Sequence, residues 1–412
     1  MHTEKERLIF HIDVNSAFLN WTNKERKKSD PDSIDLLSIP AAIGGDSTKR
    51  HGIILAKSPI AKAMGVTTGE PIVNALRKCP NLVLLPTDFK TYNQNSALLM
   101  DLLLEYSPIM QQFSIDEAFL DMTDTIHLFG EPIAVANALR ERVANELSFT
   151  VNIGISTNKL LAKMASDFKK PNLCHTLFPH EIPQKMWPLP VGELFGVGRS
   201  ARQKLSLMGI RTIGELARMD LSLLQSHLGM KYAAQIHASA NGIDLSPVEA
   251  EEPENKGIGN STTLSSDVTD FNAACQVLLA LSEAVGARLR KAGHKGSCIT
   301  VEKKDCDFKS SSHQTTLATP TASTNVIYDT AVLLLKESWD ASPLRLLGIR
   351  VTKLNEPAYE QLTLFQDAHS ERLEKLDVAI DSIRDRFGAG AIRRASFLKD
   401  NALDEQVDRK HR

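Results

Sequence analysis

The sequence predicts a multidomain protein of the α+β class, and three observations support this prediction. The chain has 412 residues, more than one hydrophobic core usually contains, so two to four domains are expected. Residues 82–176 alternate strand and helix patterns, whereas residues 177–243 read as short helices with glycine-rich junctions. An acidic linker, residues 244–255, then precedes a second region of strands and helices, residues 256–355.

The first region is expected to form an antiparallel sheet backed by helices. An apolar strand within residues 1–16 joins the pattern of residues 82–176 in a βαββαβ-like order. Between them, residues 17–81 hold a charged helix and then two short strands within Pro40–Leu55, around a Gly44-Gly45 turn. In residues 82–176, strands are expected at 82–85 and 150–155, a two-stranded hairpin at 112–121, and helices at 92–106 and 133–147.

The pattern in residues 177–243 is typical of a helix-hairpin-helix. Gly196-Val-Gly198 opens one helix pattern, and Met208-Gly-Ile leads into the next. Glycines at a helix N-terminus let backbone N–H groups approach a phosphate closely. An ordinary pair of glycine-terminated helices is the alternative. In the following region we expect strands at 258–264, 298–303 and 346–351 and helices at 273–291 and 325–337, with a tail helix at 370–386.

Composition indicates a cytoplasmic protein. No apolar run is long enough to span a membrane, and the N-terminus lacks the apolar segment of a signal peptide. The five cysteines are odd in number and form no C-x-x-C pair, so they are read as reduced thiols. The net charge of −2 argues neither for nor against nucleic-acid binding, because residues 256–355 hold 12 Lys and Arg against 9 Asp and Glu.

Acidic residues interrupt two apolar strands. Asp13 lies near the end of Leu8–Val14, and Asp116 and Glu117 lie inside Gln112–Asp121. Charged groups are costly in such surroundings unless they are paired or bind a metal. Three carboxylates from two strands could hold a pair of hard divalent cations, as enzymes of phosphoryl transfer do. The alternative is that each acid caps a strand or faces solvent.

These motifs together resemble the Y-family, or translesion, DNA polymerases over roughly residues 7–355. The resemblance rests on the first acidic strand, Ser114–Asp121, Gly154–Lys159 with Lys170-Pro171-Asn172, and Gly196–Gly198. It implies a right-hand polymerase. Its parts are a ferredoxin-like palm (1–16 and 82–176), small fingers (17–81), a helix-hairpin-helix thumb (177–243), a linker (244–255), an α/β little finger (256–355) and a tail (356–412).

The resemblance implies a template-directed, low-fidelity DNA polymerase that uses two Mg²⁺ ions, and it assigns roles to individual residues. Asp13, Asp116, Glu117 and the carbonyl of Val14 would bind the ions, with the three acids as the catalytic residues. Phe18 would be a steric gate that excludes a ribose 2′-hydroxyl. The dNTP triphosphate would contact Lys62 and Lys170, the DNA would contact Gly196, Gly198 and Arg199, and Asp121 would be structural.

Three positions depart from the pattern of DNA polymerase IV-type enzymes. Where those enzymes carry Thr, Tyr and Arg, this chain has Ala56, Pro59 and Lys62. Pro59 supplies neither a hydroxyl nor an N–H, and Lys62 lacks the bidentate fork of arginine. Lys62, together with Asp13-Val14-Asn15, looks more like the catalytic subunit of DNA polymerase V, so the subfamily stays open.

The tail carries a short motif. Gln361, Leu362, Leu364 and Phe365 fit the Gln-Leu-x-Leu-Phe pattern by which bacterial polymerases bind the β subunit sliding clamp. The expected partners are therefore primer–template DNA, dNTP and the clamp, with a monomeric chain and no membrane. Two other interpretations are a non-catalytic DNA- and clamp-binding scaffold of the same family and a nucleotidyl cyclase built on a similar palm.

Overall fold

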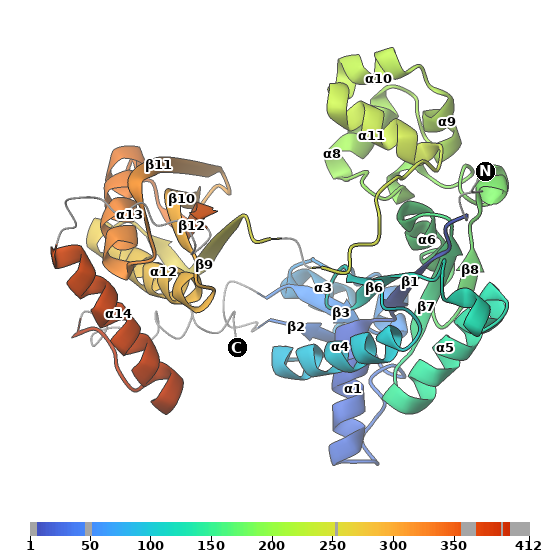
Figure 1. Cartoon of the computed structure of the whole chain (residues 1–412), viewed down its shortest axis with the longest axis horizontal. Coiled ribbons are helices and arrows are strands. Elements are labelled where there is room, and N and C mark those ends of the chain that lie inside the picture. The colour runs from blue at the N-terminus through green and yellow to red at the C-terminus, as the bar shows by residue number, and fades with distance from the viewer. Residues whose placement is uncertain (1–5, 46–51, 252–253, 356–367, 389, 396–412) are drawn as a thin grey trace. The chain divides into compact units, whose positions relative to one another are not determined.

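The computed structural model describes residues 6–45, 52–251, 254–355, 368–388 and 390–395. The chain forms two compact units, residues 1–47 with 52–252 and residues 48–51 with 253–412. Figure 1 shows helices and strands in both. Among the helices of the described residues, none combines the length and apolar composition that crossing a bilayer requires.

The first unit is built on a five-stranded sheet in the order β5-β6-β1-β7-β8. Figure 1 labels β6, β1, β7 and β8 of this sheet. The central strand β1 pairs antiparallel with both β6 and β7, whereas β7 and β8 run parallel. This confirms the expected, largely antiparallel sheet. The strands are β1 (Ile9–Val14), β5 (Met110–Gln112), β6 (Glu117–Asp121), β7 (Val151–Ser156) and β8 (Cys174–Thr176).

Alternation along β1 sends its side chains to two different layers. Phe10, Ile12 and Val14 belong to the main core, which the helices α4 (Phe89–Leu104) and α5 (Pro132–Leu147) also enter. Ile9 packs instead with Ala162 of α6 (Lys159–Ser166), on the other face. By the same alternation His11 and Asp13 lie on the α6 side of the sheet.

A glycine allows α6 to pack closely on the sheet. A Cβ added at Gly154 of β7 would lie 1.9 Å from the Ala162 carbonyl oxygen and 2.4 Å from the Ser166 backbone nitrogen. The helix begins at Lys159 because the Asn158 side chain accepts a hydrogen bond from the Leu161 N–H. Neither α6 nor β8 was among the expected elements.

The expected strand at residues 82–85 was wrongly assigned to this sheet. It forms β4 (Val83–Leu85), which pairs parallel with β2 (Ala41–Gly44) in a separate sheet of order β3-β2-β4. Leu82 is buried in the small core of that sheet, and the Val83 N–H donates to the Pro40 carbonyl, so the strand is held beside β2.

The other elements of residues 17–81 are α1 (Ala17–Ser29), β3 (Ile54–Lys57), α2 (Pro59–Ala63) and α3 (Ile72–Lys78). The two expected strands within Pro40–Leu55 are therefore present, although the second ends at Lys57 and a longer connection than a Gly44-Gly45 turn joins them.

Short helices follow, as the glycine-rich junctions predicted. The helix-hairpin-helix is formed by α8 (Arg199–Leu207) and α9 (Ile213–Arg218), and α9 begins with a capping box between Thr212 and Glu215. Asn158, at the start of α6, donates its side-chain N–H to the Gly242 carbonyl and so ties this helical region to the sheet. The remaining elements are α7 (Ile182–Lys185), α10 (Leu221–Leu228), α11 (Met230–Ala240) and the 3₁₀ turns at Ile126–Leu128, Pro179–Glu181 and Val191–Glu193.

The second unit is an antiparallel sheet of order β11-β10-β12-β9 with helices packed on it (Figure 1). The unexpected strand is β11, whose Ser- and Thr-rich residues are mostly exposed and give no apolar alternation. The elements are β9 (Gly257–Val268), α12 (Phe271–Lys291), β10 (Lys295–Asp305), β11 (Ser310–Thr321), α13 (Thr324–Ser338), β12 (Leu344–Asn355) and α14 (Ala368–Phe387).

The expected tail helix is confirmed as α14 and is attached to the second unit by ion pairs. Arg290 of α12 contacts Asp381 at 2.6 Å and Asp377 at 3.4 Å, and Arg384 contacts Glu283 at 3.0 Å. The clamp motif, residues 361–365, lies outside the described residues.

Candidate active site

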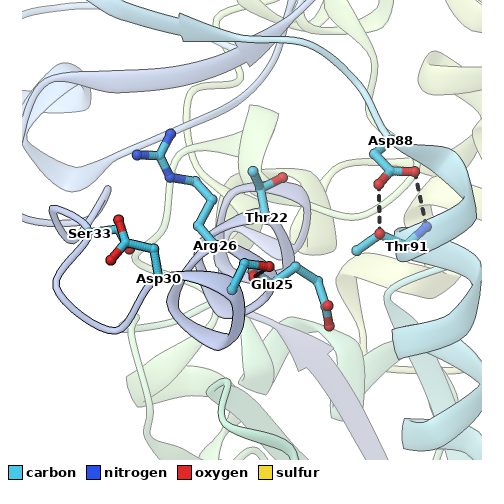
Figure 2. A pocket seen from close by; sticks show the side chains of 8 residues that line it. Thr22, Glu25, Arg26, Asp30, Ser33, Asp88 and Thr91 are labelled. Carbon is cyan, nitrogen blue, oxygen red and sulfur yellow. Dashed lines mark hydrogen bonds between the residues drawn. The ribbon is translucent and has the colours of Figure 1, made fainter.

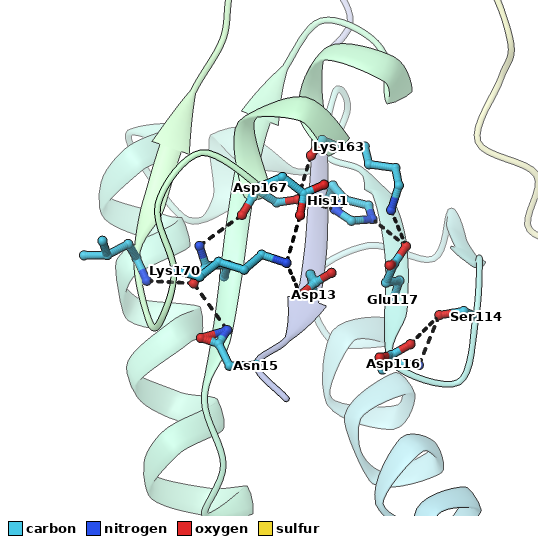
Figure 3. A network of polar contacts seen from close by, with 12 residues as sticks. His11, Asp13, Asn15, Ser114, Asp116, Glu117, Lys163, Asp167 and Lys170 are labelled. Atoms are coloured by element: carbon cyan, nitrogen blue, oxygen red, sulfur yellow. Dashed lines mark hydrogen bonds and ion pairs between the residues drawn. The ribbon is translucent and has the colours of Figure 1, made fainter. Parts of the chain in front are cut away.

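The strand register brings two of the three predicted carboxylates together. Asp13 and Glu117 are directly opposite in the antiparallel pair of β1 and β6. Asp116 precedes Glu117 in the turn, and its carbonyl accepts a hydrogen bond from the Val14 N–H at 3.0 Å. Residues about 100 positions apart in sequence therefore share one end of the sheet (Figure 3).

Asp13 is buried beside a lysine. The Lys170 ammonium lies 2.7 Å from Asp13 Oδ1 and 2.8 Å from Asp167 Oδ1. Burial raises the pKa of Asp13 to about 6, and the charge of Lys170 limits the rise. Burial alone would lower the pKa of Lys170, but the two carboxylates outweigh it and the pKa is raised. Lys170 thus stays charged and neutralises the buried acid.

Glu117 is held by a different lysine. The Lys163 ammonium donates to Glu117 Oε2 at 2.5 Å, and His11 Nε2 lies 3.4 Å from the same oxygen. Burial would raise the pKa of Glu117, but Lys163 and His11 outweigh it and lower the pKa to about 2. His11 is fully buried, which lowers its pKa, and its Nδ1 pairs with the Ser166 hydroxyl at 2.8 Å. Glu117 is therefore ionised.

Asp116 is turned away from the other two acids. Its Oδ1 accepts from the Ser114 hydroxyl at 2.6 Å, and Figure 3 shows the carboxylate directed toward Ser114. Within the described residues no three His, Cys, Asp or Glu side chains gather closely enough to hold a metal ion. Each carboxylate is instead satisfied by a lysine or a hydroxyl. The three carboxylates and the Val14 carbonyl nevertheless supply oxygen ligands, which are the ligands that hard divalent cations bind.

The predicted gate residue Phe18 and the predicted triphosphate residue Lys62 lie on helices α1 and α2. Phe18 is half-buried at the second residue of α1 and stacks on Tyr92 with ring centroids 4.5 Å apart. Lys62 is exposed on α2 and contacts none of the three acids. Asp121 caps its own turn by accepting from the Thr123 N–H at 3.0 Å, as expected for a structural residue.

The predicted DNA-binding residues form the junction before α8. Gly196 has φ +91°, a left-handed conformation that favours glycine, whereas Gly198 is the N-cap of α8 with φ −78°. A Cβ at either would meet nothing within 4 Å, so packing inside the protein explains neither glycine. Arg199 is exposed as the first residue of the helix.

Sequence reasoning missed the residues that support the acids. Lys163 and His11 were not singled out, and Asn15 was noted only as part of Asp13-Val14-Asn15. Asn15 is buried and its Oδ1 accepts from the Asn172 N–H at 2.7 Å, which fixes the turn that carries Lys170. For His11 the available signal was spacing, because it is two residues from Asp13 on the same strand face, whereas the local sequence gave no signal for Lys163.

A hollow elsewhere on the first unit is unrelated to these acids. It measures about 430 Å³ and lies between the C-terminal half of α1 and the start of α4 (Figure 2). Asp88 there caps α4 by accepting from the Thr91 N–H and hydroxyl. Its lining residues are Thr22, Glu25, Arg26, Ser29, Asp30, Ser33, Asp88 and Thr91.

Comparisons with known proteins show the family to which the chain belongs. Residues 12–167 match the impB/mucB/samB family, residues 255–364 match the C-terminal domain of that family, and residues 192–244 match the thumb domain of DNA polymerase iota. DNA polymerase IV of Clostridium acetobutylicum is 43% identical over 393 residues, 95% of this chain and 98% of that protein. The chain belongs to the Y-family of DNA polymerases.

Other relatives of this Y-family polymerase support the same conclusion. DNA polymerase IV 1 of Bacillus subtilis is 37% identical over 96% of this chain and 94% of that protein. A solved Y-family DNA polymerase chimera of Dbh and Dpo4 has a TM-score of 0.73 and 22% identity over 85% of this chain and 99% of that chain, which shows the shared fold. The chain is accordingly a DNA-directed DNA polymerase of the translesion class, and the scaffold and cyclase interpretations are not favoured.

Proposed function

We propose that this polymerase transfers nucleotides from dNTP to a primer 3′-hydroxyl at Asp13, Asp116 and Glu117. The observation that carries the proposal is the register of β1 and β6, which sets Asp13 directly opposite Glu117 with Asp116 beside them. Buried carboxylates at neighbouring strand positions are costly unless cations compensate them. In this structure two lysine ammonium groups supply that compensation.

The three acids and the Val14 carbonyl would hold two Mg²⁺ ions, with Glu117 reserved for the ion nearer the primer. Bound there, the ions would activate the primer 3′-hydroxyl and neutralise the triphosphate. Lys170 is kept beside Asp13 and is 34% exposed, so it can also reach a triphosphate. Lys62 offers a second, exposed positive charge on the fingers side.

Substrate selection and DNA binding are assigned to neighbouring elements. Phe18 would exclude the ribose 2′-hydroxyl, and its stacking on Tyr92 holds the ring in one orientation. Gly196, Gly198 and Arg199 would contact the DNA backbone, because the helix N-terminus at Gly198 is open to solvent. The relatives named DNA polymerase IV support that subfamily over polymerase V, despite Pro59 and Lys62.

Partners and compartment complete the proposal. Residues 361–365 would bind the β sliding clamp, with Gln361 at the rim and the apolar side chains of the motif in a pocket. We propose a monomeric enzyme of the cytoplasm, where five cysteines without disulfides remain reduced.

Primer extension with purified protein tests the function. A labelled primer on undamaged and abasic-site templates, with four dNTPs and Mg²⁺, should be extended according to the template, and EDTA should abolish extension. Extension past the abasic site is expected in short runs. Tight DNA binding without extension in Mg²⁺ or Mn²⁺ would refute the catalytic assignment and favour the scaffold.

A further inference from the structure

Lys163 differs from Lys170 in how firmly it is enclosed. The Lys170 side chain is 34% exposed, whereas that of Lys163 is 10% exposed. Both ammonium groups lie against a carboxylate of the site, at 2.7 and 2.5 Å. Lys170 can therefore leave Asp13 when a substrate arrives, but Lys163 has little room to leave Glu117.

Two aromatic rings from different parts of the first unit enclose the Lys163 ammonium. It lies 5.2 Å from the ring centroid of Phe113, in the turn that leads to β6, and 5.4 Å from that of Phe195, which precedes the helix-hairpin-helix. The two rings contact each other edge to face, with centroids 6.1 Å apart. Such cation–π contacts add to the hydrogen bond in holding the ammonium.

The helix that carries Lys163 is also held in place. Gly154 allows α6 to contact β7 so closely that a Cβ would overlap Ala162, and Asn158 ties the helix start to Gly242. The Lys163 backbone carbonyl accepts from the Ser166 hydroxyl, which also contacts His11. Lys163 and His11 thus belong to one packed layer behind Glu117.

The two oxygens of Glu117 have different surroundings. Oε2 accepts from Lys163 and faces His11, and among the residues that the structure describes Oε1 has no hydrogen-bond partner. We propose that Lys163 is a positioning residue that holds Oε2 of Glu117 throughout the reaction and so reserves Oε1 for a divalent cation. This inference rests on the proposed role of Glu117 as a metal ligand.

The arrangement has a measurable consequence for cation binding. An ammonium group and a cation on the two oxygens of one carboxylate repel each other at a separation of a few ångströms. That repulsion exceeds the conformational entropy cost that is avoided when one glutamate side chain is already fixed before the cation binds. Lys163 therefore weakens cation binding while it orients the ligand for turnover, and a variant without the charge should separate the two effects.

The test compares Lys163→Met and Lys163→Arg in the full chain. Mn²⁺ binding is titrated by electron paramagnetic resonance with primer–template and an α,β-imido dNTP that cannot be turned over. Lys163→Met should bind Mn²⁺ at least about threefold more tightly. In Mg²⁺ its kcat should fall about 10- to 100-fold with a nearly unchanged KM for dNTP. Lys163→Arg keeps the charge and should restore both parameters toward the parent.

A matched control lies one turn earlier on α6. Lys159 donates to Gln111 at 2.9 Å and lies over Phe119, but contacts none of the acids, so Lys159→Met should match the parent. Parental Mn²⁺ affinity and kcat in Lys163→Met would overturn the inference. So would a joint loss of Mn²⁺ binding, DNA binding and thermal stability, since that is the result of a merely structural lysine. Failure of the proposed function itself is recognised separately, by undiminished extension in Asp116→Asn.

Discussion

Two lysines near one helix compensate the buried Asp13 and the half-buried Glu117 in the candidate active site. Lys163 contacts Glu117 from within α6, and Lys170 contacts Asp13 from the turn that follows the helix. Asp116 has only the Ser114 hydroxyl as a side-chain partner among the described residues. Removing an acid therefore has different consequences at each position. Without Glu117 the enclosed Lys163 ammonium would lose its carboxylate, whereas without Asp13 the more exposed Lys170 would keep Asp167. Asp116 is the cleanest position for testing charge alone.

Asp116→Asn should abolish most primer extension without disturbing the fold. Asparagine keeps a carbonyl oxygen that can accept from Ser114, and the backbone contact to Val14 is untouched. The loss of a charge shared by two cations should lower the extension rate on the order of 10³-fold or more. The rate is measured in single turnover with Mg²⁺. DNA affinity, measured by fluorescence anisotropy, should equal that of the parent, and near-parental extension would end the catalytic assignment.

Phe18→Ala should increase ribonucleotide insertion while dNTP use persists. The change opens space at the first turn of α1, where the Phe18 ring stacks on Tyr92. The ratio of kcat/KM for dNTP over rNTP measures the effect and should fall at least tenfold, about 1.4 kcal/mol. Phe89 is a matched control, because its ring is in the same cluster, 6.1 Å from Phe18. If the ratio of kcat/KM for dNTP over rNTP is the same in Phe18→Ala as in Phe89→Ala, Phe18 is a packing residue and not the gate.

Individual elements carry features that internal packing does not require. Gly198 begins α8 with an ordinary φ and open space where a Cβ would stand. In contrast, Gly154 and Gly196 are demanded by a close helix contact and by a positive φ. The open space at Gly198 is consistent with the proposal that DNA approaches its backbone from outside.

Gly198→Ala should weaken DNA binding without lowering stability. The added methyl group stands between the α8 N-terminus and an approaching phosphate, and a loss of about 3- to 10-fold in primer–template affinity is expected at low salt. The melting temperature should stay within about 1–2 °C of the parent, since an added Cβ would have no atom within 4 Å apart from those of the adjoining residues. Gly196→Ala should lower the melting temperature because of its φ of +91°. Unchanged DNA affinity in Gly198→Ala would remove this junction from the proposed interface.

The tail helix α14 is a structural part of the second unit. Asp377 is buried, accepts from the Thr324 N–H at 2.8 Å and pairs with Arg290 at 3.4 Å. Asp377→Asn removes the charge from this network, so the second unit should lose about 1–3 kcal/mol of stability. Urea unfolding with fluorescence detection measures the loss. Asp385→Asn, at an exposed position of the same helix, should change nothing, and equal stability of both variants would contradict the assignment.

At the scale of the whole molecule, charge gives the polymerase little general affinity for DNA. The net charge is −2, and the excess of basic residues in 256–355 is only three. Because phosphate contacts supply most non-specific affinity, such a chain should dissociate readily from its template at physiological salt. A second attachment, such as the proposed clamp motif, would therefore decide how long it stays.

Leu364→Ala with Phe365→Ala should abolish clamp-stimulated synthesis and spare the basal reaction. Apolar anchors of this kind are each worth on the order of 2 kcal/mol, or roughly 30-fold in affinity. Extension of short primers without clamp should stay parental, because no residue of the acidic site changes. Thr363→Ala is the control at the variable position of the motif. A pull-down in which the double variant retains the clamp as well as the parent would refute the motif.

The sequence by itself determined most elements and the acids of the site. The strands that carry Asp13 and Glu117 are apolar enough to be recognised locally, and helices such as α5 and α12 follow their apolar periodicity to within two residues. Capping residues account for helix ends that differ from the expected ones. Asp88 caps α4, so the helix begins at Phe89, three residues before the expected Tyr92.

Only the tertiary structure decided which sheet β4 joins, that polar β11 is a strand, and which lysines neutralise the acids. Each of these depends on contacts between residues distant in sequence. Lys163 and Glu117 are 46 positions apart, and nothing in the local pattern of α6 distinguishes Lys163 from Lys159. What distinguishes them is burial against a carboxylate that arrives on another strand, and local propensity carries no information about that pairing.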